Sequence, residues 1–505
     1  MAQRLIRQHW FIALFLFLLV FSVGLRFMSA GLLHYDSINL AERIDSNLAN
    51  HEFKGLSAGG RYGMVAVVTA VYVPLSWFGY DVDFAIRLNG VLMLALSAVA
   101  MYFLAFEMTR SRIGSIGAGL LLVSTSFYII SASFGKEHST ALFFFVLACF
   151  AALRAHRSAW KGWSVVASVS VILAVAVREA WLIAVPVFVW FLLSPKLPAT
   201  DGEPITFGRA WKAGAICFAV VTAAAFALFL GKSVFSVAAD NSTGIAWKEF
   251  SLIRGVLHLA GATAYMLPFF IFGWYAVWRA GRRYAFPLAV WFALILYISN
   301  IIGYHVRYLD VVLVPFVLVV SFAIAWLYAR WYIVGVGVLL FLVLTTFWTP
   351  LPLLEVRHNT NNPQEFSAYV ASITPADSII ISMDESAFLR FYGNRTGESV
   401  LLLNETKLEV ADKIVRWKRN GTQVYVLSFV QYYPQTKDFL EYLDKNFQTQ
   451  TVGSHLMDNY HVADVGLNLF NVSIIRVGAP KFSLDMINQS PDETMLAVWL
   501  QQGLS

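Results

Sequence analysis

Residues 113–153 read IGSIGAGLLLVSTSFYIISASFGKEHSTALFFFVLACFAAL, and this stretch decides the class of fold. Two apolar runs, 113–130 and 139–153, flank a turn with the sequence FGKEH at 134–138. A helix needs about 20 mainly apolar residues to cross a bilayer, and charged side chains next to hydrocarbon are costly. The pattern therefore predicts membrane helices joined by a short charged turn.

The rest of the chain repeats this pattern. Of its 505 residues, 58% are hydrophobic and 13% are charged, whereas soluble domains carry about 25% charged residues. No globular core can bury that much apolar surface, so the sequence predicts a polytopic α-helical membrane protein with about 11 spans. The runs are 10–31, 88–106, 113–130, 139–153, 163–177, 180–194, 213–230, 257–278, 285–302, 308–328 and 331–348.

Basic residues predict the orientation of the spans. Arg4 and Arg7 precede the first span, and several later loops are basic, so these parts should be cytoplasmic. This topology requires the short run 63–80, which Pro74 interrupts, to lie at the interface instead of crossing. We therefore expect a multi-pass protein of the plasma (inner) membrane, with a cytoplasmic N-terminus.

Two domains are expected. Residues 1–349 form the membrane domain, with a first outer loop at 32–87, and residues 350–505 form a soluble extracytoplasmic α/β domain. In this tail, β-rich runs alternate with helical stretches, as in small α/β domains. The strands are Ser378–Ser382, Ser399–Leu403 and Val424–Phe429, and the helices are Lys407–Lys418 and Thr436–Asn446.

Two acidic residues fall on the predicted outer face. Asp36 lies just beyond the first span, before a helical pattern, where it is either a helix cap or a general base. Glu137 lies in the outer turn between Lys136 and His138, which is either a solvated turn with snorkelling side chains or a functional site. As a pair, Asp36 and Glu137 can serve as a base and as a ligand for a divalent ion or an acceptor hydroxyl.

Cationic residues fall on the same face. Arg178 interrupts an apolar stretch, where it either pairs with Glu179 or holds a phosphate through its forked donors. A second cationic turn, which also fits interface anchoring, contains His305, Arg307 and Tyr308. Weaker candidates in the first loop are Arg61, Tyr62 and Arg87.

Several classes of protein are disfavoured by the sequence. No Gly-rich phosphate loop, His-Glu-x-x-His, Cys-x-x-Cys or Gly-x-Ser-x-Gly motif is present. The two cysteines, Cys149 and Cys217, lie inside apolar runs, which argues against disulfides and thiolate metal sites. The net charge of +6 reflects basic loops between spans, so no nucleic-acid partner is expected.

The residues resemble those of the GT-C superfamily of membrane glycosyltransferases, in particular protein O-mannosyltransferases and aminoarabinose transferases. The resemblance covers roughly Trp10 to Val320. His34-Tyr35-Asp36 before an amphipathic helix resembles the family's first-loop Asp-Glu motif, with Ser37 in place of the second acid. Ala85-Ile86-Arg87-Leu88 resembles an Ala-x-Arg-Leu motif at the second span.

Three further positions carry the resemblance. Glu137 falls where the family has its second acidic residue, usually Asp, and Arg178 falls where relatives often place a Lys or Arg. Val306-Arg307-Tyr308 resembles the Arg-Tyr that opens a late span, with Pro315 following. The chain departs from the pattern in its first loop, where Gly59-Gly60-Arg61-Tyr62-Gly63 replaces the usual Pro-Pro-Leu.

The resemblance implies an inverting transfer of a sugar from a polyprenyl-phosphate donor to a glycan, lipid or protein acceptor on the outer face. Asp36 would activate the acceptor hydroxyl, and Arg178, Arg307 and Tyr308 would hold the donor phosphate. Glu137 would position the acceptor or a metal, supported by the residues Lys136, His138, Arg61, Tyr62 and His305. No cofactor is required by the pattern, and a divalent metal ion held by Asp36 and Glu137 is left open.

Other functions stay open at this point. A flippase or transporter for lipid-linked glycans would need polar residues along a path through the membrane, and charges within the spans are almost absent. A non-catalytic envelope assembly protein would tolerate replacement of Asp36 and Glu137. A glycan polymerase or ligase would share the proposed chemistry.

Overall fold

The computed structural model divides the chain into two units. The first comprises Met1–Leu32 and Arg43–Asn359, and the second comprises Leu33–Glu42 and Thr360–Ser505. The described residues are 2–55, 61–155, 162–178, 263–280, 282–302, 310–383, 385–399, 407–432, 438–458 and 469–481, with isolated positions between 181 and 191.

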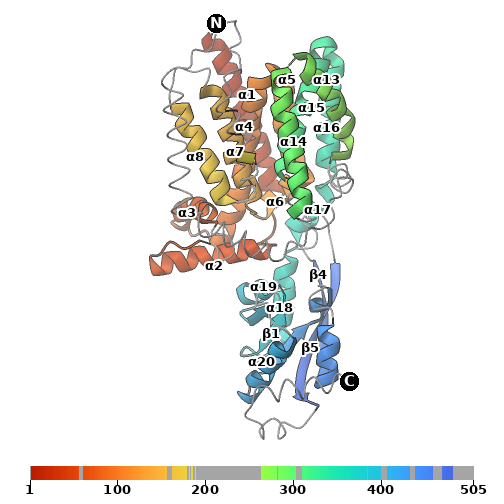
Figure 1. The fold of residues 1–505 in the computed structure, drawn as a ribbon. Coiled ribbons are helices and arrows are strands. Elements are labelled where there is room, and N and C mark those ends of the chain that lie inside the picture. Colours follow the sequence, from red (N-terminus) through yellow and green to blue (C-terminus); the bar gives the residue numbers. More distant parts are fainter. Residues whose placement is uncertain are drawn as a thin grey trace. The chain divides into compact units, whose positions relative to one another are not determined.

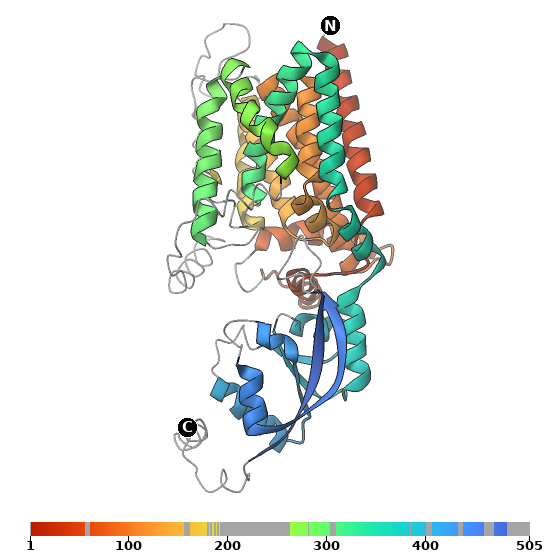
Figure 2. The same cartoon turned by 90° about the vertical axis from the view of Figure 1, so that its right-hand side faces the viewer.

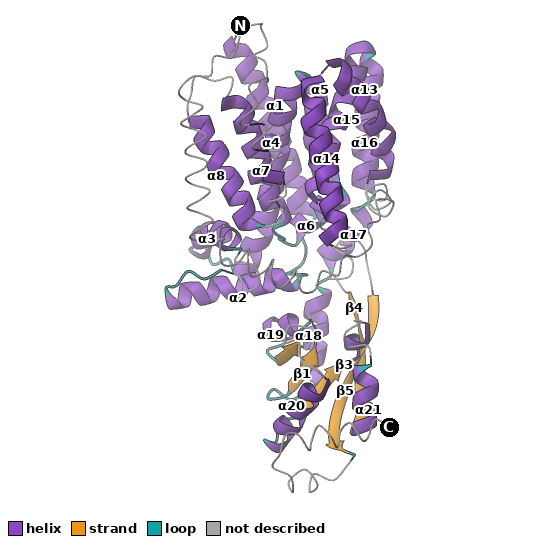
Figure 3. Cartoon of the chain, viewed as in Figure 1, coloured by secondary structure: helices purple, strands orange, loops and turns teal. Residues whose placement is uncertain are grey.

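The first unit is helical throughout its described part (Figures 1 and 3). A further helix, α2 (Tyr35–Asn50), begins in the second unit and ends in the first. The helices of the first unit are α1 (Ala2–Arg26), α3 (Tyr62–Ser76), α4 (Val82–Thr109), α5 (Arg112–Ser124), α6 (Ser126–Ser133), α7 (His138–Ala155), α8 (Gly162–Val177), α13 (Leu267–Ala280), α14 (Arg282–Ile302), α15 (Asp310–Arg330), α16 (Tyr332–Trp348) and α17 (Leu351–Asn359).

The described helices include four that are long and apolar enough to cross a membrane, or up to six if each bent pair counts as one span. The four are His9–Arg26, Val82–Thr109, His138–Ala155 and Val311–Arg330. The chain is thus a multi-pass helical membrane protein, while the count of 11 crossings stays a prediction. The runs 180–194 and 213–230 lie mainly or wholly outside the described residues, as do residues 257–262 of the run 257–278.

The run 113–130, expected to be one helix, is broken. It forms α5 and α6, which meet at an angle of 57°. At the break, the hydroxyl of Thr125 donates a hydrogen bond to the carbonyl of Leu122 (2.8 Å) and that of Ser124 donates to Leu121 (3.3 Å). Such side-chain bonds compete with the backbone ladder of the helix. As a result, α6 ends directly beneath the charged turn at 134–138.

The second unit contains a five-stranded mixed sheet of order β2-β1-β3-β5-β4. Strand β1 pairs in parallel with β2 and β3, whereas β5 pairs antiparallel with β3 and β4. Figure 2 shows β4 and β5 as a long twisted pair. The strands are β1 (Ile379–Ser382), β2 (Thr396–Ser399), β3 (Val424–Leu427), β4 (Phe447–Asp458) and β5 (Leu469–Pro480).

Helices accompany this sheet, and one face of it is buried beneath them. Ile414, Val426 and Leu443 belong to its apolar core. The segment 33–42 belongs to the same unit, where the Arg390 guanidinium contacts the Glu42 carboxylate (Nη2–Oε2, 3.1 Å). The helices are α18 (Asn362–Ile373), α19 (Ser386–Phe391), α20 (Lys407–Arg419) and α21 (Phe439–Asn446), with a 3-10 helix at Ser428–Tyr432.

Candidate active site

The turn at 134–138 is fixed by close packing against α4. Gly135 has a φ of +74°, and a Cβ at this position would lie 2.6 Å from the carbonyl oxygen of Ile86. Gly90, one turn further along α4, lies just as close to Ala132. The backbone N–H of Lys136 donates to the carbonyl of Ser131 (3.0 Å) and closes the turn. Only glycine fits this conformation and this spacing, so α4 sets the place of the next three residues.

Two further helices bring cations to the turn. Arg61 immediately precedes α3, and Arg178 immediately follows α8. A Cβ on Gly63 would lie 2.7 Å from the backbone of Ala176, so α3 and α8 approach closely at this point. The close approach places the two arginines at one end of the bundle.

The structure brings five of the predicted site residues together. The Arg61 Nη1 atom lies 3.4 Å from the Glu137 Oε1 atom, and the Arg178 guanidinium donates to a ring nitrogen of His138. Glu137 is 6% exposed, and Lys136, His138 and Arg178 are also buried. The ring of His138 packs edge-on against Phe127 at 4.6 Å. Because His138 accepts from a cation, we assign it as neutral.

The positive charges dominate this cluster. Burial raises the pKa of Glu137, but the charges of Arg61, Lys136 and Arg178 outweigh burial and lower the pKa from 4.5 to about 2. Glu137 is therefore a carboxylate at physiological pH and a weak base. Among the described residues, three cations against one carboxylate leave a formal excess of two positive charges. The cluster favours an anion, and we call it the cationic cluster.

Glu137 should also stabilise the fold. We expect Glu137→Gln to lower stability by about 3–5 kcal/mol, because it leaves buried cations without their carboxylate. The lowered pKa means that this stabilisation is complete above the unfolded-state pKa of Glu137 and is lost as the pH falls towards about 2. Thermal unfolding of wild type and Glu137→Gln between pH 3 and 7 measures this difference in stability, which should be largest at pH 7 and shrink below the unfolded-state pKa of Glu137. Equal melting temperatures of the two proteins at pH 7 would contradict the ion-pair assignment.

Sequence reasoning missed one buried cation near the turn. Arg357, on α17, is fully buried, and its guanidinium lies 5.7 Å from the centre of the Phe134 ring. Its carbonyl accepts from the N–H of Ala30, which ties α17 to the end of α1. The only signal in the sequence is an Arg-His pair shortly beyond the last apolar run. Arg357 thus contacts the residue that precedes Gly135 and packs against the start of the turn.

Arg87 has a different place from the cationic cluster. Its Nε donates to Asp83 (2.5 Å), and its Nη1 donates to the carbonyl of Ser29 (2.6 Å). The first contact lies within α4, and the second joins the start of α4 to the segment that follows α1. The structure thus gives Arg87 a structural role.

Asp36 lies in the first turn of α2, within the second unit. Its backbone N–H donates to the His34 Nδ1 atom (3.1 Å), and its carboxylate lies 3.6 Å from the same atom. This N–H bond assigns the imidazole proton to Nε2, so His34 is neutral. The Asp36 side chain is 19% exposed and His34 is buried. Asp36 is therefore an accessible carboxylate on an ordered helix, and its pairing with Glu137 in one site stays a prediction.

The remaining predicted site residues divide into two groups. Tyr62 is the first residue of α3, with its ring 6.1 Å from that of Phe53. His305, Arg307 and Tyr308 lie outside the described residues, as does Glu179.

Within the described part of the chain, no three His, Cys, Asp or Glu side chains gather as metal ligands.

The fold defines a class of protein. No protein-family model and no curated protein matches the chain by sequence. Comparison with solved structures shows that the chain has the fold of GT-C membrane glycosyltransferases. This agrees with the resemblance carried by the motifs.

The solved structures similar to this chain include two of ArnT, an aminoarabinose transferase from Cupriavidus metallidurans, and one of a mycobacterial arabinofuranosyltransferase, AftD. ArnT in the apo state has a TM-score of 0.61 at 15% identity, and ArnT bound to undecaprenyl phosphate has 0.60 at 16%. In both cases 94% of this chain and 98% of ArnT are covered. AftD has a TM-score of 0.53 at 12% identity, with 94% of this chain but 40% of AftD covered.

Proposed function

We propose that this protein is a membrane glycosyltransferase that transfers a sugar from a polyprenyl-phosphate donor to a hydroxyl acceptor on the outer face of the membrane, with inversion. The observation that carries the proposal is the cationic cluster around Glu137 at one end of a membrane helix bundle. The GT-C fold supports it, and so does the undecaprenyl phosphate bound by one structure with that fold.

The charge of the cluster suits the leaving group. In the proposed step the acceptor oxygen forms a bond to the anomeric carbon, and the bond from that carbon to the phosphate oxygen breaks. The donor phosphodiester carries one negative charge, and the departing polyprenyl phosphate carries up to two. Cations placed where charge develops stabilise the transition state more than the ground state. We assign Arg178, Arg61 and Lys136 to this phosphate, together with Arg307 and Tyr308.

The proton of the acceptor hydroxyl needs a separate base. Glu137 is a poor candidate because its lowered pKa makes it a weak base. We assign the proton to the carboxylate of Asp36, which is partly exposed and lies on the ordered helix α2. Glu137 then positions the cations, and its replacement should displace them.

The residues of the cluster do not fit a divalent cation. Glu137 contributes one carboxylate and is surrounded by positive side chains, whereas Mg²⁺ and Mn²⁺ need several oxygen ligands and repel nearby cations. We therefore propose that the cations of the chain stabilise the leaving phosphate directly.

Transfer should accordingly be insensitive to chelation. We expect EDTA to leave the rate of donor consumption unchanged, since no step in the proposal uses a metal. The measurement is the initial rate with purified protein before and after EDTA. A loss of rate that added Mn²⁺ or Mg²⁺ restores would show that a metal takes part.

The proposal as a whole is tested by incubating the purified chain with a panel of polyprenyl-phosphate sugars and a mixture of envelope glycans, lipids and peptides. We expect one donor to be consumed with release of polyprenyl phosphate and formation of a glycoside of inverted configuration. A matched reaction with Gly135→Val, which cannot adopt the turn, should consume none. If no donor is consumed while the lipid-linked sugar crosses vesicle membranes, the chain is a flippase instead.

A further inference from the structure

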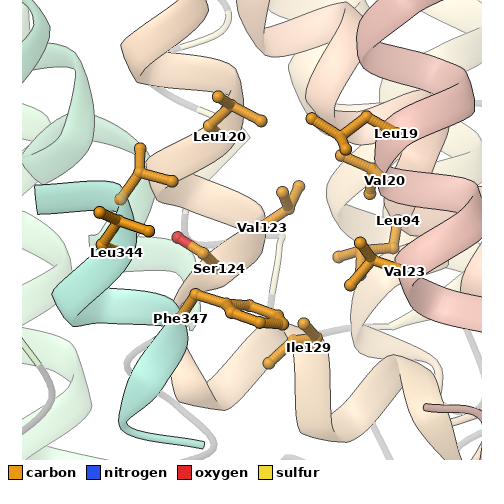
Figure 4. A pocket seen from close by; sticks show the side chains of 11 residues that line it. Leu19, Val20, Val23, Leu94, Leu120, Val123, Ser124, Ile129, Leu344 and Phe347 are labelled. Carbon is orange, nitrogen blue, oxygen red and sulfur yellow. The ribbon is translucent and has the colours of Figure 1, made fainter. Parts of the chain in front are cut away.

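The helical unit contains an apolar cavity whose lining includes no residue of the charged turn. This cavity of about 180 Å³ lies between α1, α4, α5, α6 and α16 (Figure 4). Its lining is apolar except for Ser124, whose hydroxyl donates to the carbonyl of Leu121 within α5. Apolar cavities of about 150 Å³ stay dry and bind small hydrocarbons. The occupant of this cavity should therefore be hydrocarbon.

The cavity opens to the lateral surface of the helix bundle. Leu19 on α1 and Leu344 on α16 both line it, and they are 39% and 66% exposed. Their neighbours Leu18, Leu340 and Phe341 are exposed as well. Since α1 is a candidate span and α16 belongs to a bent pair that passes the same test, this surface faces the hydrocarbon of the bilayer. A lipid chain can enter from the side.

A cation lies at one end of the cavity. Leu19, Val23 and Arg26 follow each other at i, i+4 and i+7 on α1, so Arg26 continues the stripe that lines the cavity by one turn. The Arg26 guanidinium lies 5.3 Å from the centre of the Phe27 ring, and that ring contacts the cavity residue Phe347 at 6.1 Å. Arg26 is exposed and α1 ends with it. An exposed arginine at the end of a span is well placed for a lipid phosphate.

We propose that the cavity binds one acyl chain of a membrane glycerophospholipid whose phosphate contacts Arg26. A chain in the cavity and a phosphate one helical turn further along α1 match the order of the two groups in such a lipid. The proposed function assigns the donor phosphate to the cationic cluster, and on that assignment Arg26 serves a different lipid from the donor. The bound lipid fills the seam between the first span and α16.

The test is native mass spectrometry of the full chain purified in detergent after incubation with phosphatidylglycerol vesicles. We expect a retained phospholipid on the wild type and a several-fold loss of it in Val23→Trp, which fills the cavity. Leu18→Trp, an exposed position on the same helix outside the lining, should retain the lipid. Arg26→Gln should weaken retention, whereas Arg279→Gln, another exposed arginine over an aromatic ring, should not.

A second measurement guards against misfolding of the cavity variant. A phospholipid with a photoreactive group in its acyl chain should label wild-type residues 19–23 and 343–347 more than the rest of the bundle surface. Even labelling over the bundle, or equal retention by Val23→Trp and Leu18→Trp, would overturn the proposal. Displacement of the phospholipid by polyprenyl phosphate at equal concentration would also overturn it, because the site would then belong to the donor.

Discussion

Replacing Arg178 by Gln should lower kcat by about 10²–10³-fold, the usual effect of losing one group that stabilises developing negative charge. Arg178 is buried, its guanidinium donates to His138, and its charge acts on Glu137 in the turn. On bond breakage the leaving phosphate gains charge, so the loss should fall on kcat more than on the KM of the acceptor. Initial rates with a polyprenyl-phosphate sugar over a range of both substrates measure this.

Two variants separate a role in the reaction from a role in folding. Arg178→Lys keeps the positive charge but loses the planar, bidentate donors of the guanidinium. Its rate should therefore lie between those of Arg178→Gln and the wild type. Arg154→Gln is the matched control. Arg154 lies on α7 about 24 Å along the helix from His138, and its Nη1 atom is 2.9 Å from Oε1 of buried Glu107. It should lower the melting temperature and leave kcat unchanged. Equal loss of activity in Arg154→Gln and Arg178→Gln would show that stability, and not charge, limits the rate.

The helical class of the chain could be predicted from hydropathy. In lipid, a long apolar run must satisfy its own backbone hydrogen bonds, and an α-helix does so within one segment. The run at 139–153 lies within α7, and the run at 331–348 corresponds to α16. The break at Thr125 could not be predicted, since it depends on which of several hydroxyls bond to the backbone of their own helix. The periodicity of apolar residues does not indicate which hydroxyl will bond to the backbone and break the helix.

The sheet was predicted only in part. The strand at Ile379–Ser382 and the helix at Lys407–Arg419 lie where β-rich and amphipathic patterns indicate. Strand β2 ends at Ser399, where the sequence placed the start of a strand. The long strands β4 and β5 were missed. Their sequences, FQTQTVGSHLMD and LFNVSIIRVGAP, lack clean alternation because much of β4 is exposed and polar.

The cationic cluster illustrates what motifs can and cannot predict. Lys136, Glu137 and His138 are adjacent in the sequence, so their shared location needs no structure. Arg61 and Arg178 join them only through the close packing of Gly63 against α8, which no local pattern indicates. Arg357 was missed for the same reason, since its contact with Phe134 joins residues more than two hundred positions apart.

Replacing Asp36 by Asn should lower the rate of sugar transfer by about 10²–10⁴-fold, the usual contribution of a general base. The amide has the shape of the carboxylate but cannot accept the proton of the acceptor hydroxyl. The backbone N–H of Asp36 still donates to His34 in the variant, so the first turn of α2 should be preserved. Transfer rates and the melting temperature of both proteins measure the two effects separately.

Asp45→Asn is the matched control, because Asp45 is an exposed carboxylate on the same helix α2. It should leave transfer unchanged. Binding of polyprenyl phosphate gives a second readout, since a base that acts on the acceptor should not change affinity for the donor's lipid phosphate. If Asp36→Asn transfers sugar as fast as the wild type, another group takes the proton. If Asp36→Asn loses binding of polyprenyl phosphate together with transfer, Asp36 organises the donor site. The assignment of the acceptor proton to Asp36 and of the donor phosphate to the cationic cluster is then wrong.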